Sequence, residues 1–111
     1  MSDPAPKKYF LCRLLPPRPT FMADLTEAER NVMREHAAYW TEQAKKGPAI
    51  VFGPVADPKG GWGVGIVEAA SDEEMKTLEQ NDPAIRANIG MHYEILPMLR
   101  AIVRGTTSAA H

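Results

Sequence analysis

The sequence lacks the features that would direct it to a membrane, a secretory route or a nucleic acid. It has no apolar run long enough to span a bilayer, and residues 1–8 contain no apolar segment of the signal-peptide kind. Neither sign of charge dominates, because the formal net charge is −1, so nothing draws the chain toward nucleic acid or an anionic membrane. We therefore expect a cytoplasmic protein without nucleic-acid or membrane partners.

Cysteine is almost absent, since Cys12 is the one cysteine in 111 residues. A single thiol cannot form an intramolecular disulfide, which fits a reducing compartment. A zinc site built on two or more cysteines of one chain is excluded for the same reason. The length suits one domain with a modest core and is too short for two.

Hydrophobic runs and turn signals predict four strands. Residues 9–15 form an apolar run of strand formers that ends at a proline cluster. Residues 49–53 form a second strand, which Pro54 should end. A turn rich in proline and glycine then leads into a third strand over residues 62–68, which predicts a hairpin. The last strand covers residues 91–96.

Capping patterns predict the helices between these strands. Thr26 and Glu29 form a capping box, so a helix should run from there to about Lys46, before Gly47-Pro48. A second capping pattern at residues 71–74 opens another helix. The element order is therefore β-α-β-β-α-β, which predicts an α+β, ferredoxin-like fold with a four-stranded antiparallel sheet.

Domain bounds and pairing follow from this order. We expect a folded domain over residues 8–103 with flexible tails at residues 1–7 and 104–111, because both ends are polar or rich in small residues. The first strand is apolar on both faces, although two helices can cover only one face of the sheet. A second copy of the chain is the simplest cover for the other face, so we predict a homodimer through the sheet.

His36 is a candidate functional residue on the first helix. Met33, Ala37, Trp40 and Ala44 form the apolar stripe of that helix, and His36 lies roughly 70° from the centre of the stripe. A histidine at the border of a buried face can line a cleft and transfer protons near neutral pH. The alternative is a structural histidine whose ring covers the core.

Asp82 is the second candidate, in the segment Asn81-Asp82-Pro83. An aspartate before a proline at the first helical position is a good N-cap, which is a purely structural role. A capping carboxylate is also held ionised and fixed, so it can orient a nearby imidazole. The sequence leaves open whether Asp82 and His36 touch.

A set of short motifs occurs in a fixed order along residues 8–98, namely Glu35-His36, Gly53-Pro54, Gly65, Asp82-Pro83, Gly90, Tyr93, Glu94 and Pro97. Together these motifs resemble the YCII-related family. The resemblance implies a ferredoxin-like fold paired into a dimeric α+β barrel, similar in architecture to muconolactone isomerases. It also implies that a catalytic histidine–aspartate pair falls on His36 and Asp82.

We predict a substrate-binding set of Arg13, Trp40, Phe52, Pro54 and His92. Arg13 interrupts an apolar strand and could neutralise an anionic substrate, although an ion pair with an acidic residue on the neighbouring last strand is the favoured alternative. The tryptophans are also candidates for the core or an interface. We expect no metal and no cofactor, because no pair of histidines has a helical ligand spacing.

Three hypotheses for function follow. The first is a small enzyme in which the pair catalyses cofactor-independent isomerisation or elimination on a small cyclic or unsaturated organic acid or phenol. The second is a non-catalytic module that binds a metabolite. The third is a haem-associated or oxygen-using enzyme, because related barrels carry such chemistry. Pro97 should end the last strand, because a proline cannot donate to the ladder. The loop over residues 15–25 is long, and its Phe21 and Met22 either cover the pocket as a lid or pack against a neighbour.

Overall fold

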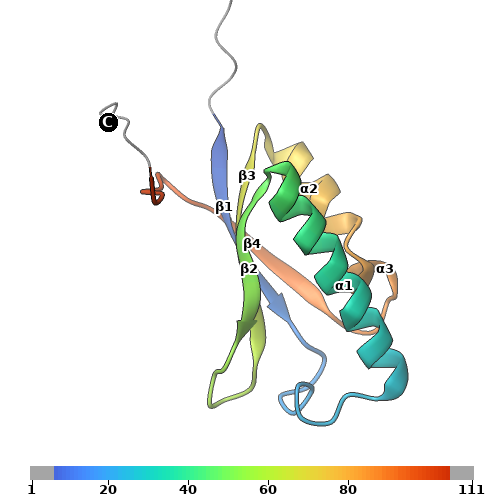
Figure 1. The fold of residues 1–111 in the computed structure, drawn as a ribbon. Helices are drawn as coiled ribbons and strands as arrows, with labels where there is room; N and C mark the ends of the chain where they lie inside the picture. Colours follow the sequence, from blue (N-terminus) through green and yellow to red (C-terminus); the bar gives the residue numbers. More distant parts are fainter. Residues whose placement is uncertain (1–6, 106–111) are drawn as a thin grey trace, which may run out of the picture.

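The computed structural model of the chain describes residues 7–105 and shows a four-stranded antiparallel sheet with helices on one face (Figure 1). The strand order is β2-β3-β1-β4, which is the order of a ferredoxin-like fold, so the predicted fold class is confirmed. The predicted tails lie almost entirely outside the described residues. The elements are β1 (Lys8–Leu15), α1 (Glu27–Lys46), β2 (Ala49–Val55), β3 (Trp62–Ala69), α2 (Asp72–Gln80), α3 (Pro83–Arg86) and β4 (His92–Pro97).

Helix α1 has the bounds that its capping residues predict. The Thr26 side chain accepts a hydrogen bond from the backbone N–H of Glu29, and the Glu29 side chain accepts one from the backbone N–H of Thr26. At the other end, Gly47 adopts a φ of 129°, and its N–H donates to the carbonyl of Gln43. Both ends of α1 are therefore fixed by local sequence.

Two prolines lie inside strands that they were expected to end. Pro54 pairs with Gly63 within β2, and Pro97 pairs with Phe10 at the end of β4. Both strands are at the edges of the sheet, where a missing backbone N–H on the outer side removes no ladder bond. The sequence prediction of the strand ends was wrong for this reason.

The helix-facing side of the sheet holds the core. Phe10, Cys12 and Leu14 alternate along β1 toward the helices, and each is at most 3% exposed. Burial also raises the pKa of the Cys12 thiol to about 12, with a smaller contribution from the charge of Glu79. A thiol in that state is protonated and serves as a packing group.

The buried side of α1 differs from the predicted stripe. Its buried residues are His36, Trp40 and Gln43, whereas Ala37 and Ala44 of the predicted stripe are exposed. His36 is therefore central to the buried face rather than at its border. The two alanines face a cavity instead of the core, as described below.

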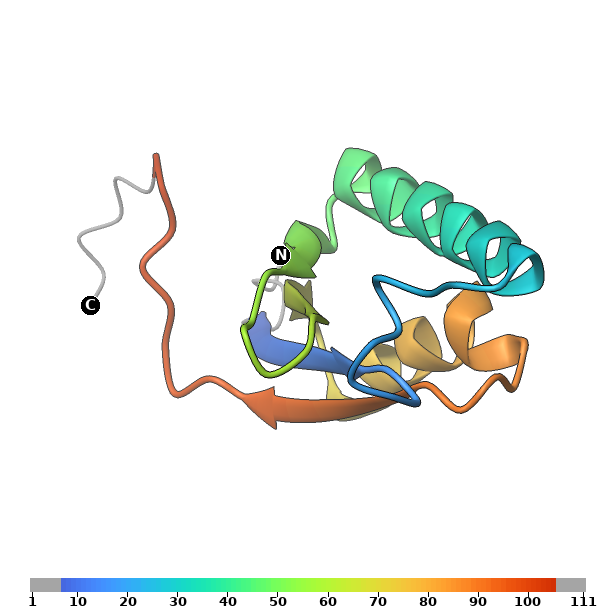
Figure 2. The ribbon, with the colours of Figure 1, turned by 90° about the horizontal axis from the view of Figure 1, so that it is seen from below.

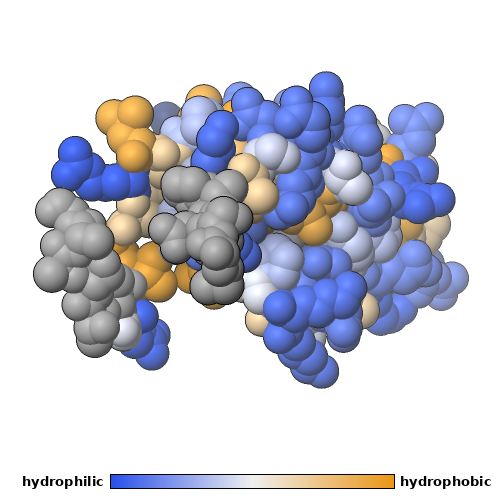
Figure 3. Space-filling view, turned by 90° about the horizontal axis from the view of Figure 1, so that it is seen from above, coloured by the Kyte–Doolittle hydropathy of each residue, from blue (hydrophilic) through white to orange (hydrophobic). Residues whose placement is uncertain are grey.

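The other side of the sheet, here called the open face, is not covered by a helix (Figure 2). Val51 and Leu96 point to this side and are 54% and 53% exposed. Seen from above, hydrophilic residues predominate over the helices, and hydrophobic residues stand out toward the segment that follows β4 (Figure 3). The two sides of the sheet therefore have different surfaces.

Candidate functional site

The centre of the candidate site is the carboxylate of Asp82, which is fully buried. Asp82 is the N-cap of α3, and its Oδ1 accepts the backbone N–H of Ala84 at 2.9 Å, as the sequence predicts for a residue before Pro83. Its Oδ2 accepts the indole N–H of Trp40 at 2.9 Å and the hydroxyl of Tyr93. Besides capping α3, Asp82 therefore accepts two further hydrogen bonds, one from a side chain of α1 and one from a side chain of β4.

His36 supplies the fourth donor. Its Nδ1 lies 2.9 Å from both carboxylate oxygens of Asp82, so the two candidate residues are in direct contact. An ionised carboxylate only accepts hydrogen bonds, so the proton of this bond is on Nδ1 of His36. When the ring is neutral, its other nitrogen, Nε2, carries the lone pair.

The donors keep Asp82 ionised despite its burial. Burial by itself raises the pKa of this carboxyl, but the hydrogen bonds and charge of His36 and the bonds from Tyr93 and Trp40 outweigh it, so its pKa lies below the ordinary value. Burial, followed by the charge of Asp82, raises the pKa of Tyr93. Tyr93 is thus a protonated donor, and Asp82 is a fixed negative charge beside His36.

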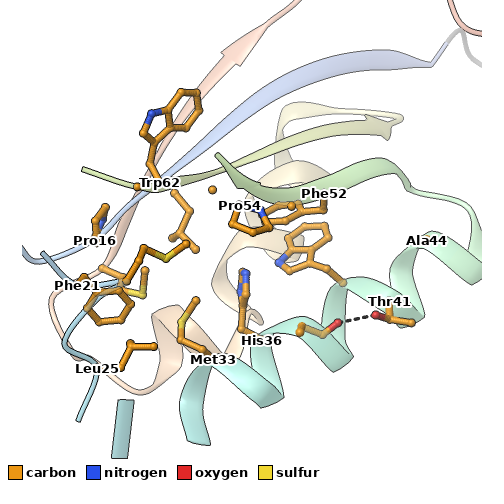
Figure 4. Close-up of a pocket in the computed structure, with 18 residues that line it drawn as sticks. Pro16, Phe21, Leu25, Met33, His36, Thr41, Ala44, Phe52, Pro54 and Trp62 are labelled. Atoms are coloured by element: carbon orange, nitrogen blue, oxygen red, sulfur yellow. Dashed lines mark hydrogen bonds between the residues drawn. The ribbon is translucent and has the colours of Figure 1, made fainter. Parts of the chain in front are cut away.

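Nε2 of His36 faces a cavity of about 480 Å³ between α1, β2, β3 and the loop over residues 16–25. Figure 4 shows the ring pointing away from α1 toward Phe52 and Pro54 of β2. Among residues 7–105, no protein group hydrogen-bonds Nε2. A bound molecule can therefore meet this nitrogen directly.

The wall of the cavity is mainly apolar, and His36 is its one titratable side chain in the described residues. The ring of Phe52 stacks on Trp40 with centroids 4.4 Å apart and meets the His36 ring edge to face at 5.4 Å. The Thr41 hydroxyl donates to the backbone carbonyl of Ala37, which satisfies its proton. The wall residues in the described part of the chain are Leu14, Pro16, Phe21, Met22, Leu25, Met33, His36, Ala37, Trp40, Thr41, Ala44, Phe52, Gly53, Pro54, Gly61, Trp62, Gly63 and Met91.

The loop over residues 16–25 covers one side of this cavity, and Arg18 holds it in place. The Arg18 guanidinium donates to Asp24 at 2.8 Å and to Glu29 of α1 at 2.7 Å. Phe21 of the loop is fully buried and lines the cavity beside Met22. The hydrogen bond from Arg18, together with the backbone N–H of Thr26, lowers the pKa of Glu29 to about 2. The contact between Arg18 and Glu29 is therefore an ion pair at neutral pH.

The predicted substrate-binding residues fall into two groups. Trp40, Phe52 and Pro54 line the cavity. Arg13 and His92 lie on the open face and do not line it. The guanidinium of Arg13 donates to the carboxylate of its cross-strand neighbour Glu94 at 2.8 Å, which confirms the ion pair favoured by the sequence.

Tyr93 is the site residue that the sequence analysis did not assign. The signal was available, because Tyr93 is the cross-strand neighbour of Leu14, and Leu14 faces the helices. The three cavity methionines, Met22, Met33 and Met91, were also missed as a group. They come from a loop, a helix and a turn, so no local pattern unites them.

Neither a metal site nor a membrane helix is found in residues 7–105. That part of the chain contains no group of three or more histidine, cysteine, aspartate or glutamate side chains that could hold a metal ion. Within the same range, no helix has the length and apolar character needed to cross a bilayer.

The fold and the site together define a ferredoxin-like α+β protein with a buried aspartate–histidine pair at the wall of an apolar cavity. The family model of the YCII-related domain matches residues 9–99, so the chain belongs to the YCII-related family. A solved structure of an uncharacterised protein from Thermotoga maritima has a similar fold, with a TM-score of 0.50 at 8% identity over 84% of this chain and 99% of that one. No curated protein matches the chain.

Proposed function

We propose that the protein is a small enzyme that uses His36 as a general acid/base for cofactor-independent isomerisation or elimination. The observation that carries this proposal is the fixed orientation of His36, with Nδ1–H bound to Asp82 and Nε2 open to the cavity. A base oriented by a buried carboxylate and aimed into a largely apolar cavity is an arrangement that suits proton transfer.

The proton steps use both states of the imidazole. Nε2 of His36 takes a proton from a carbon or hydroxyl of the bound substrate, and the negative charge of Asp82 stabilises the imidazolium that forms. The same nitrogen then returns the proton to another atom of the substrate, which completes an isomerisation, or the substrate expels a leaving group, which completes an elimination. Asp82 stays ionised and acts as the positioning residue.

Of the two predicted substrate classes, the cavity wall suits a phenol better than an organic acid. None of the wall residues is an arginine or a lysine, and Arg13 lies on the other side of the sheet. A carboxylate placed in this wall would lose its hydration without gaining a fixed cation, which is unfavourable. A small cyclic molecule with one hydroxyl gains apolar contacts and one hydrogen bond to Nε2 of His36.

A binding module without catalysis is the second candidate. The observation that favours it is that His36 is the single titratable group in the described wall, so a second acid or base would have to come from the substrate itself. In this case the ligand accepts or donates one hydrogen bond at Nε2, and Asp82 serves to fix the ring.

The experiment is a thermal-shift screen of a metabolite library, followed by mass spectrometry of each hit after incubation with the protein. We expect the wild type to convert at least one hit, His36→Ala to bind without converting it, and His92→Ala to convert it normally. His92 is the matched control because it is a histidine on the open face. Full turnover by His36→Ala would overturn the catalytic role, and binding without product in the wild type would establish the binding module.

We also infer that two chains pair through their open faces. The exposed Val51 and Leu96 on that face support this pairing, as does the dimeric barrel that the resemblance to the YCII-related family implies. Location in the cytoplasm remains part of the proposal and is supported by the composition alone.

A further inference from the structure

The segment over residues 98–105, here called the C-terminal arm, leaves the domain at a fixed point. The backbone N–H of Met98 donates to the carbonyl of Tyr9 at 2.8 Å, which anchors the start of the arm to β1. From there the arm runs on the side of the sheet opposite the helices and stands clear of it (Figure 2). The arm therefore lies on the same side of the sheet as the open face.

Two apolar side chains of the arm are almost fully exposed, whereas Met98, Ala101 and Val103 are partly covered. Leu99 is 103% exposed and Ile102 is 98% exposed, so neither is covered by any residue of the described chain. Single exposed apolar residues are common on protein surfaces. Two almost fully exposed aliphatic side chains on one extended segment are more typical of a segment that binds another surface.

The open face offers such a surface without an unpaired charge at its centre. Arg13 is paired with Glu94 at 2.8 Å, and the Tyr9 hydroxyl donates to Glu68 at 2.7 Å. The Glu68 carboxylate also lies 3.9 Å from the Lys7 ammonium, so each of the two carboxylates on this face has a nearby cation and these four groups carry no net charge. Such a face fits a surface of its own kind, which is what a two-fold homodimer supplies.

We propose that the C-terminal arm crosses to a second copy of the chain, where Leu99 and Ile102 pack against the open face of that copy. The arm can span roughly 25 Å when extended, which exceeds the width of a sheet whose four strands lie about 4.8 Å apart. The two-fold symmetry gives each dimer two such contacts, so removing the arm's side chains affects the interface twice. This inference rests on the proposed pairing of the sheets and goes beyond it.

The first test measures the dimer dissociation constant of the full chain by analytical ultracentrifugation. We expect the double variant Leu99→Asn/Ile102→Asn to weaken dimerisation at least tenfold with an unchanged far-ultraviolet circular dichroism spectrum, because these side chains contact nothing in their own domain. The matched control is Arg100→Asn/Arg104→Asn, which changes two exposed charged residues of the same arm and should leave the constant within about threefold.

Each outcome decides a separate point. A wild type that is monomeric at all concentrations overturns both the sheet pairing and the role of the arm. A wild-type dimer whose constant is unchanged in Leu99→Asn/Ile102→Asn keeps the sheet pairing and overturns the role of the arm. The catalytic proposal is tested by product formation and is independent of both results.

A cross-linking experiment distinguishes a crossing arm from one that folds back. A chain with Ile102→Cys is mixed with a tagged chain carrying Val51→Cys, and a short bis-maleimide is added; Cys12 is fully buried and does not compete. We expect a cross-linked species that contains one chain of each kind. A chain with both substitutions that cross-links only within itself, or a mixture that yields no mixed species, would contradict the proposal.

Discussion

The two faces of the sheet handle polar and apolar groups in opposite ways. On the helix side, the carboxylate of Asp82 is fully buried and receives hydrogen bonds from three side chains and one backbone N–H. On the open face, Val51 and Leu96 are more than half exposed, and the ion pair of Arg13 and Glu94 is in contact with solvent. A buried charge is stable when hydrogen-bond partners surround it. A patch of exposed apolar side chains is typical of a surface that binds another molecule. The helix side therefore suits chemistry and the open face suits association.

The largest expected effect comes from removing the buried carboxylate. Asp82→Leu leaves the donors of Trp40 and Tyr93 without an acceptor, so we expect the free energy of unfolding to fall by about 3–5 kcal/mol. Urea denaturation measures this loss. Asp82→Asn retains one acceptor oxygen and should lose less.

Asp57 provides the matched control for this prediction. Its carboxylate also accepts a tryptophan indole N–H, from Trp62 at 2.9 Å, and a backbone N–H, from Lys59, but at a partly exposed site in the β2–β3 hairpin. Water can replace Asp57 as an acceptor, so Asp57→Leu should cost about 1 kcal/mol. If Asp57→Leu and Asp82→Leu lower the free energy of unfolding equally, burial is not the reason for the large effect expected at Asp82.

The same carboxylate makes stability depend on pH, with an effect smaller than its deletion because protonation removes only the charge. The pKa of Asp82 is lower in the folded protein than in the unfolded chain, so its contribution is complete at neutral pH and is lost as pH falls from about 4 through the folded pKa. Urea denaturation at several acidic pH values should show a shallower decline for Asp82→Asn than for the wild type. Parallel declines would mean that Asp82 does not account for the acid sensitivity.

Glycines on the two faces give a smaller contrast. A Cβ on Gly65 would lie 2.3 Å from the ring of Phe52, whereas a Cβ on Gly53 would have nothing within 4 Å. We expect Gly65→Ala to cost about 1–3 kcal/mol in thermal or urea unfolding and to disturb the stacking of Phe52 on Trp40, which forms the cavity wall. Gly53→Ala should be within about 0.5 kcal/mol of the wild type. A loss at Gly53 as large as at Gly65 would mean that the close contact is not the cause.

Local signals explain how much of this molecule could be predicted from its sequence. The bounds of α1 follow from its capping box and from Gly47, and the N-cap role of Asp82 follows from Pro83, because each depends on residues within one helical turn. The cross-strand pair of Arg13 with Glu94 was accessible too, since the fold class makes their strands neighbours.

The remaining features depend on contacts between distant segments. Periodicity treats every apolar residue of a helix as core, but Ala37 and Ala44 line a cavity, and a cavity wall is as apolar as a core. That error moved the centre of the predicted stripe and placed His36 at its border. The bonds from Trp40 and Tyr93 to Asp82 join residues from three elements, and no local pattern contains them.

The smallest expected effect is the coupling between Arg13 and Glu94 on the open face. Their side chains are 37% and 48% exposed, so a double-mutant cycle with Arg13→Ala and Glu94→Ala should give about 0.2–1 kcal/mol in urea unfolding of dilute protein. Added salt should reduce this coupling, because exposed charges are screened. At concentrations where two open faces meet, the pair leaves water, so the coupling should become less sensitive to salt. If the coupling has the same salt dependence in dilute and concentrated protein, the open face stays in solvent at both concentrations. A second copy of the chain would then not explain why apolar side chains are exposed on that face.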